Sequence, residues 1–245
     1  MMQKLGRVPM MVILIVAAAA MYALRLEQLQ ALSVGVKYHL PTWVCAISVV
    51  LFAIWCWFLR PRKKYNAISG RSPLVLFGTL AAAAGLLLGC VAMIRELEND
   101  YDLLMAAGGA VTAICWSVIA LERFRGRRIP APLFMIPTLF YAVRLIFDFR
   151  NWSRDPMILD YGFDLLALIC IMCATFHLCG FCFDKGKRRL TAFFCCCGIL
   201  FGAAAIAGGR MRELAMTGGA MLWLASNLWT LLRPARKRQE AKPAE

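Results

Sequence analysis

Eight separated blocks of apolar residues constrain what this chain can fold into. Each is close to the roughly 20 residues that an α-helix needs to cross a hydrocarbon core about 30 Å thick. Because apolar residues make up 61% of the 245 residues, a water-soluble fold could not bury them all. The chain is therefore predicted to be an integral membrane protein. The blocks are residues 8–26, 42–59, 73–94, 103–121, 132–149, 157–183, 191–209 and 214–232.

The spans are expected to be helices. Inside lipid the backbone must satisfy its own hydrogen bonds, which leaves helices or closed barrels. The blocks are too long and too uniformly apolar for the alternating strands of a barrel. We predict an all-α membrane protein, an eight-span transmembrane helical bundle.

The distribution of Lys and Arg predicts the orientation, because positive residues near span ends stay in the cytoplasm. Twenty of the 28 lie at the N-terminus, in the links after the second, fourth and sixth blocks, and in the tail. Both termini are therefore predicted to be cytoplasmic, in a multi-pass protein of the cell (plasma or inner) membrane. The basic rim would contact the bilayer's anionic lipids, so we expect no nucleic-acid partner despite the net charge of +14.

Three short similarities indicate an internal repeat. Residues 22–26 match 141–145 at four of five positions, and residues 78–84 and 108–110 resemble 198–205 and 218–220. Four spans per half predicts two parallel four-helix halves, 1–121 and 122–232, followed by a basic cytoplasmic tail, 233–245. Chance similarity in Ala-, Gly- and Leu-rich sequence is the alternative. The repeat favours a retained first span, although that block also resembles a signal peptide.

Two GxxxG spacings, Gly85 to Gly89 and Gly198 to Gly202, place glycine pairs on single helix faces. Such faces let another backbone approach closely. Tight packing within the bundle is one interpretation, and a homodimer interface is the other.

Charged residues enter the membrane around the fifth and sixth blocks. Tyr141, Arg144 and Asp148 are spaced i, i+3 and i+7 and share one helical stripe, while Asp160 and Asp164 share another. A charge at mid-membrane costs about 2.5–3.5 kcal/mol, so such groups face the bundle interior, a partner or water. The charged stripes are therefore expected to face inward.

Arg144 is expected to pair with Asp160, Asp164 or Asp148. One interpretation is a buried ion pair that locks the hairpin of spans five and six. The other is a ligand site in which Arg144 holds an anionic group, or the carboxylates bind a cation or relay protons. Tyr141 and Tyr161 would form its hydrogen-bonding walls. The candidate ligand-binding residues are thus Tyr141, Arg144, Asp148, Asp160, Tyr161 and Asp164.

A cysteine cluster at the end of the sixth block is the candidate for a metal site, through His177, Cys179 and Cys182. The CxxC spacing is typical of a redox pair or half a zinc site. The next cysteines, 195–197, form a contiguous triplet rather than a second CxxC. Free cysteines in apolar spans act as small hydrophobes, so we expect no metal and no cofactor.

The chain contains no HExxH, GxSxG or Walker motif and has only two histidines, His39 and His177. The favoured hypothesis is a transporter or channel for a small solute or ion, with a polar site between spans five and six. The alternatives are a receptor, assembly or regulatory membrane protein without catalysis, and a membrane-embedded hydrolase using Asp160 and Asp164. An enzyme is the less favoured class.

Overall fold

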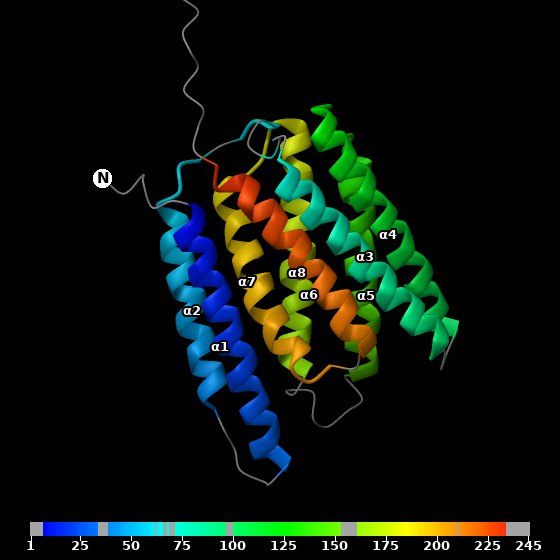
Figure 1. Ribbon diagram of the computed structural model, residues 1–245. Coiled ribbons are helices and arrows are strands. Elements are labelled where there is room, and N and C mark those ends of the chain that lie inside the picture. Colours follow the sequence, from blue (N-terminus) through cyan, green and yellow to red (C-terminus); the bar gives the residue numbers. More distant parts are fainter. Residues whose placement is uncertain are drawn as a thin grey trace, which may run out of the picture.

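The computed structural model describes residues 7–33, 39–61, 63–65, 68, 72–96, 100–152, 161–209 and 211–233, and these form eight α-helices without a strand (Figure 1). The helices run alternately up and down. Their bounds are α1 Arg7–Ser33, α2 Leu40–Trp57, α3 Pro73–Arg95, α4 Asp100–Arg125, α5 Pro132–Trp152, α6 Gly162–Gly180, α7 Arg188–Ile206 and α8 Met211–Leu231, with a short 3-10 helix, η4 Phe181–Phe183.

Each helix coincides with one predicted apolar block, so the all-α prediction is confirmed. Seven of these helices, α1 to α7, are long and apolar enough to cross a membrane. The remaining helix, α8, contains Arg212, Glu213 and Asn227, which lower its hydropathy. The chain is thus a polytopic helical membrane protein, and a count of eight spans stays a prediction.

Six helices form a closed ring. Helices α3, α4, α5, α6, α7 and α8 each pack against the next, and α8 returns to pack along α3. The α1–α2 hairpin packs outside this ring, mainly against α7, at one side of the bundle (Figure 1). Many large apolar side chains, such as Val16, Leu88 and Leu139, are exposed on the outside of the bundle, as a lipid-facing surface requires.

Glycines close the ring between α3 and α8. A β-carbon at Gly219 would lie 2.7 Å from the carbonyl oxygen of Ala82, and one at Gly85 would lie 3.2 Å from the Cα of Gly219. The two backbones therefore touch directly, as small residues allow. The second GxxxG face, Gly198 and Gly202, contacts α8 side chains. Both faces are used within the chain, so a homodimer through them would have to displace α8.

Helices of the two predicted halves are combined in space. The ring takes α3 and most of α4 from residues 1–121 and α5 to α8 from residues 122–232, whereas α1 and α2 pack mainly against α7 and each other. The duplication stays a prediction from sequence similarity.

Aromatic side chains fill the middle of the ring. Trp116 of α4 and Trp223 of α8 stack with ring centroids 4.9 Å apart, and Trp116 also stacks on Tyr141 of α5 at 6.4 Å. Phe134 packs against Trp223 at 6.2 Å. None of these four residues is exposed. We call Trp116, Phe134, Tyr141 and Trp223 the aromatic plug.

Candidate functional site: a charged cavity at one end of the ring

The helix ring has two chemically different ends. The end at which α2, α4, α6 and α8 stop carries the links rich in Lys and Arg, and we call it the basic end; it is the upper end in Figure 1. The opposite end holds a cavity of about 160 Å³, to which all six ring helices contribute side chains. The aromatic plug lies between the two ends. The polar residues of this charged cavity are Tyr101, Asp102, Arg144, Asp148, Asp164, Arg212, Glu213 and Thr217.

An ion pair anchors Arg144 in the cavity wall. Its Nε donates to Asp148 Oδ2 at 3.3 Å, one helical turn further along α5. The Tyr101 hydroxyl of α4 donates to the other oxygen, Asp148 Oδ1, at 3.0 Å. Phe147 packs on the Tyr101 ring at 4.7 Å. Asp148 therefore accepts from both α4 and α5 and holds the Arg144 side chain in one orientation.

Two guanidinium donors at the cavity have no hydrogen-bond partner among the described residues. They are Nη1 of Arg144 and Nη1 of Arg212, and both atoms are buried. The Arg144 residue is 8% exposed. A buried donor without a partner costs about 1–3 kcal/mol, and more when it is charged. A ligand that brings a hydrogen-bond acceptor to these two donors would therefore be stabilised in the cavity.

Two of the carboxylates that line the cavity come from different helices. Asp164 of α6 interacts electrostatically with Glu213 of α8, a like charge, and with Arg25 and Arg144. Arg25 comes from α1, where its guanidinium lies 5.1 Å from the Phe163 ring centre. Asp164 takes part in none of the ion pairs found among the described residues.

The structure brings together three of the six predicted site residues: Arg144, Asp148 and Asp164 line the cavity. Tyr141 lies deeper, in the aromatic plug, where its hydroxyl is buried and finds no hydrogen-bond partner among the residues that the structure describes. Tyr161 caps the start of α6, half-buried, and is not part of the cavity lining. Asp160 lies outside the described residues.

The ion pair of Arg144 lies within one helix. The sequence offered Asp148, Asp160 and Asp164 as partners, and the structure pairs Arg144 with Asp148 on α5 itself. This pair does not tie α5 to α6. The interpretation of a lock on the hairpin therefore has no support from it, although it explains why both charges tolerate the interior.

Sequence reasoning missed five polar cavity residues: Tyr101 and Asp102 of α4, and Arg212, Glu213 and Thr217 of α8. Arg212 counts as a link residue when the apolar block is taken to start at 214, but α8 begins at Met211. For the residues at the helix ends, the missing information was helix length: one more turn lets Tyr101, Asp102, Arg212 and Glu213 line the cavity with Asp148 and Asp164.

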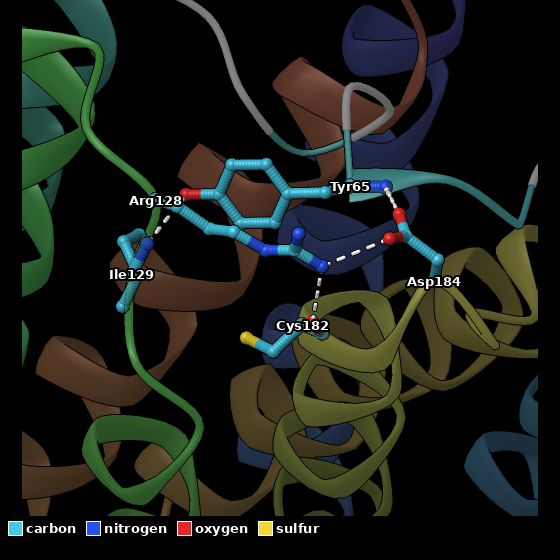
Figure 2. A network of polar contacts seen from close by, with 5 residues as sticks. All are labelled: Tyr65, Arg128, Ile129, Cys182 and Asp184. Carbon is cyan, nitrogen blue, oxygen red and sulfur yellow. Dashed lines mark hydrogen bonds and ion pairs between the residues drawn. The ribbon is translucent and has the colours of Figure 1, made fainter.

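Three links at the basic end are joined by a network around Tyr65 and Asp184 (Figure 2). The Tyr65 backbone N–H donates to Asp184 Oδ1 at 2.7 Å, and Arg128 Nη2 donates to Asp184 Oδ2 and to the Cys182 carbonyl, both at 2.8 Å. The Tyr65 hydroxyl accepts from the Ile129 N–H at 3.0 Å. We call these five residues, Tyr65, Arg128, Ile129, Cys182 and Asp184, the basic-end clasp.

Left-handed backbone conformations at the ends of α4 and α6 position the clasp residues. Asp184 has a left-handed conformation, φ 55°, and follows the end of α6, where the Lys185 N–H donates to the Gly180 carbonyl. Gly126, φ 75°, ends α4 in the same way. The N–H of Tyr65 and the guanidinium of Arg128 hold the pKa of the Asp184 carboxyl below its ordinary value of 3.8. The charged form of Asp184 is therefore the one that the clasp stabilises.

A second buried arginine lies between the clasp and the plug. Arg123 of α4 is 2% exposed, and none of its three guanidinium nitrogens has a hydrogen-bond partner among the described residues. Its guanidinium carbon lies 5.8 Å from the ring centres of both Phe134 and Trp223. Cation–π attraction therefore compensates part of its desolvation.

The candidate metal residues have separate neighbours. His177 stacks on Phe194 of α7 at 5.5 Å, whereas the Cys179 thiol donates to the Ala131 carbonyl at 3.7 Å. Cys182 belongs to the clasp through its carbonyl. Among the described residues, no group of three His, Cys, Asp or Glu side chains is placed to hold a metal ion. All eleven cysteines are unpaired thiols.

Comparisons with protein-family models, curated proteins and solved structures gave no match to the chain.

Proposed function

We propose that this protein is a membrane transporter for a small polar solute, which binds in the charged cavity. The observation that carries the proposal is the cavity itself, a small chamber to which all six helices of a closed ring contribute. Polar and ionisable groups inside a membrane bundle are expensive, and they mark substrate or ion pathways by default. A solute site on the axis of a helix ring can be accessible first from one end of the ring and then from the other.

Two layers that separate the cavity from the basic end favour transport. The aromatic plug fills the ring behind Arg144, and the clasp joins three links beyond it. A carrier needs a closed barrier on one side of its bound solute, which opens when the other side closes. Movement of α4, α5 and α8 past each other would open this barrier, because these helices carry the plug.

The proposal includes α8 as an eighth span. Gly78, Gly85 and Gly89 of α3 approach Ser226, Gly219 and Met216 of α8 in turn, so α8 runs antiparallel to α3 along most of its length. If α3 crosses the bilayer, α8 crosses it too. The lower hydropathy of α8 agrees with its place in the ring, where Thr217, Ser226, Asn227 and Thr230 are buried against protein.

Reconstitution tests the proposal. Purified protein in liposomes is offered labelled small solutes of each charge class: ions, amines, carboxylates and zwitterions. We expect uptake of one class by wild type and its loss in Arg212→Gln, which removes a cavity charge. Arg95→Gln, at an exposed arginine ending α3 outside the cavity, is the matched control and should keep uptake.

Binding of a solute without its uptake into liposomes would contradict transport. A receptor or regulatory protein, the second candidate, would show a solute-dependent rise in melting temperature but no uptake. The buried plug is the observation that favours this alternative, because a permanently filled ring can bind a solute and still pass nothing.

A further inference from the structure

The geometry points to a small zwitterion, bearing one carboxylate and one ammonium group, as the occupant of the charged cavity. This inference rests on the proposed function, because it names the class of solute that the transporter would carry. Three observations lead to it: unpaired cationic donors, facing carboxylates, and the size of the chamber.

The anionic half of the ligand follows from the arginines. Arg144 and Arg212 each leave Nη1 buried and without an acceptor among the described residues. Asp148 orients the Arg144 side chain in advance by accepting from its Nε, and Nη1 is left without an acceptor among the described residues. A carboxylate has two oxygens in the geometry that a guanidinium recognises best, so it would satisfy donors that a neutral hydroxyl satisfies less strongly.

The cationic half follows from the acids. Asp164 and Glu213 line the same cavity and repel each other electrostatically. An ammonium group near both would turn this repulsion into two attractions, and its three donors match carboxylate oxygens. Asp164 takes part in none of the ion pairs of the described residues, although Arg25 and Arg144 also attract it.

A ligand with a single charge fits less well. Four acidic side chains and two arginines line the cavity, so an anion would meet more acidic groups than arginines. A simple cation would correct that balance but leave both arginine nitrogens without an acceptor. Only a molecule that carries both charges provides an acceptor for the arginine nitrogens and a cation for the carboxylates.

The volume of the cavity limits the size of the ligand. Its volume of about 160 Å³ is close to the roughly 150 Å³ of an engineered protein cavity that holds one benzene molecule. The smallest amino acids have a similar number of heavy atoms. Longer side chains would have to enter the aromatic plug, whose residues are fully buried.

Three compounds of matched size test the charge requirement. Alanine carries both charges, lactate replaces its ammonium with a hydroxyl, and alaninamide replaces its carboxylate with a neutral amide. Binding to the full chain in lipid nanodiscs is measured by calorimetry. We expect alanine to bind, and lactate and alaninamide to bind roughly 10- to 100-fold more weakly, as expected when one charged hydrogen-bonding group is lost.

Variants locate the two halves of the site. Arg212→Gln and Asp164→Asn should each weaken alanine binding by roughly 10- to 100-fold, whereas Arg95→Gln should leave it unchanged. Arg144→Gln is less suitable, because Arg144 is buried against Asp148 and the variant would threaten folding. Retention of the wild-type elution volume and melting temperature identifies variants that remain folded.

Several outcomes would overturn the inference: lactate or alaninamide binding as tightly as alanine, alanine binding that survives both substitutions, or no binding of alanine, glycine or serine. Failure of the proposed function gives a different result. Uptake of a purely anionic or cationic solute that depends on Arg212 would keep transport and reject the zwitterion. Alanine binding without uptake in liposomes would keep the zwitterion and reject transport.

Discussion

Trp116 and Trp223 stack in the middle of the helix ring with their centroids 4.9 Å apart and their planes 9° from parallel. They come from α4 and α8, which lie on different sides of α3, and the pair joins these helices across the interior. Both are fully buried. The stack therefore separates the charged cavity from the basic end.

Truncation of the plug should both destabilise the protein and open the ring. Trp223→Ala is expected to cost about 3–5 kcal/mol of unfolding free energy, because a large buried ring is lost. Liposomes containing the folded fraction should leak small ions. Trp43→Ala, at a tryptophan that is 68% exposed, is the control for both measurements. If liposomes with the folded Trp223 variant leak no more ions than liposomes with wild type, the stack is not the barrier.

Adjacent glycines of α8 should differ sharply in their tolerance of a methyl group. Gly219→Ala places a β-carbon 2.7 Å from the Ala82 oxygen and 2.9 Å from the Leu86 nitrogen, so α3 and α8 must separate. We expect a loss of about 1–3 kcal/mol in denaturant titration. At Gly218 the nearest atom is 3.9 Å away, so Gly218→Ala should be neutral or stabilising by up to about 1 kcal/mol. Equal effects at both positions would contradict the α3–α8 contact.

Tyr101→Phe removes one hydrogen bond from the cavity wall. The hydroxyl donates to Asp148 at 3.0 Å, whereas the ring, packed on Phe147, is kept. Because the acceptor is charged, the loss is expected to be about 1.5–3 kcal/mol in thermal or denaturant unfolding. Tyr22→Phe, at an exposed tyrosine of α1, should change nothing measurable. An unchanged melting temperature for Tyr101→Phe would argue against this contact.

Acidification should loosen the basic-end clasp through Asp184. Its pKa in the folded protein lies below the ordinary value of 3.8, mainly because of the Tyr65 N–H and then Arg128. The stabilisation is therefore fully present above that ordinary pKa and is lost as the pH falls through the lower folded pKa. We expect the melting temperature of wild type to approach that of Asp184→Asn as the pH falls below about 4.

Asparagine is the suitable replacement at Asp184, because it tolerates the left-handed conformation found there. The comparison with this variant subtracts the other carboxylates, which titrate in both proteins. A difference in melting temperature that does not change with pH would show that the Asp184 charge does not contribute.

The side on which each terminus lies distinguishes seven spans from eight. If α8 crosses the membrane beside α3, reporters fused at both ends of the chain should lie on the same side, the predicted cytoplasm. A fluorescent reporter should then be active at either end, and alkaline phosphatase inactive at either end. Reporters on opposite sides would mean that α8 does not span.

Local sequence periodicity predicted part of the candidate site. Arg144 and Asp148 are four residues apart, so any helix brings them to one face, and the structure pairs them. Tyr141 was expected beside them as a binding wall, but it packs against Trp116 in the plug. Spacing along one helix cannot tell which neighbouring helix a side chain meets.

Sequence alone determined the number of helices, their approximate bounds and their membrane character, because a run of apolar residues must form a helix in lipid whatever its neighbours are. Tertiary structure alone decided that α8 closes a ring with α3 and that Arg212, Glu213 and Tyr101 share a cavity with Asp164. Between apolar helices in lipid, burial of apolar surface does not choose partners. The close fit of small residues such as Gly85 and Gly219 does, and that fit depends on shapes in three dimensions.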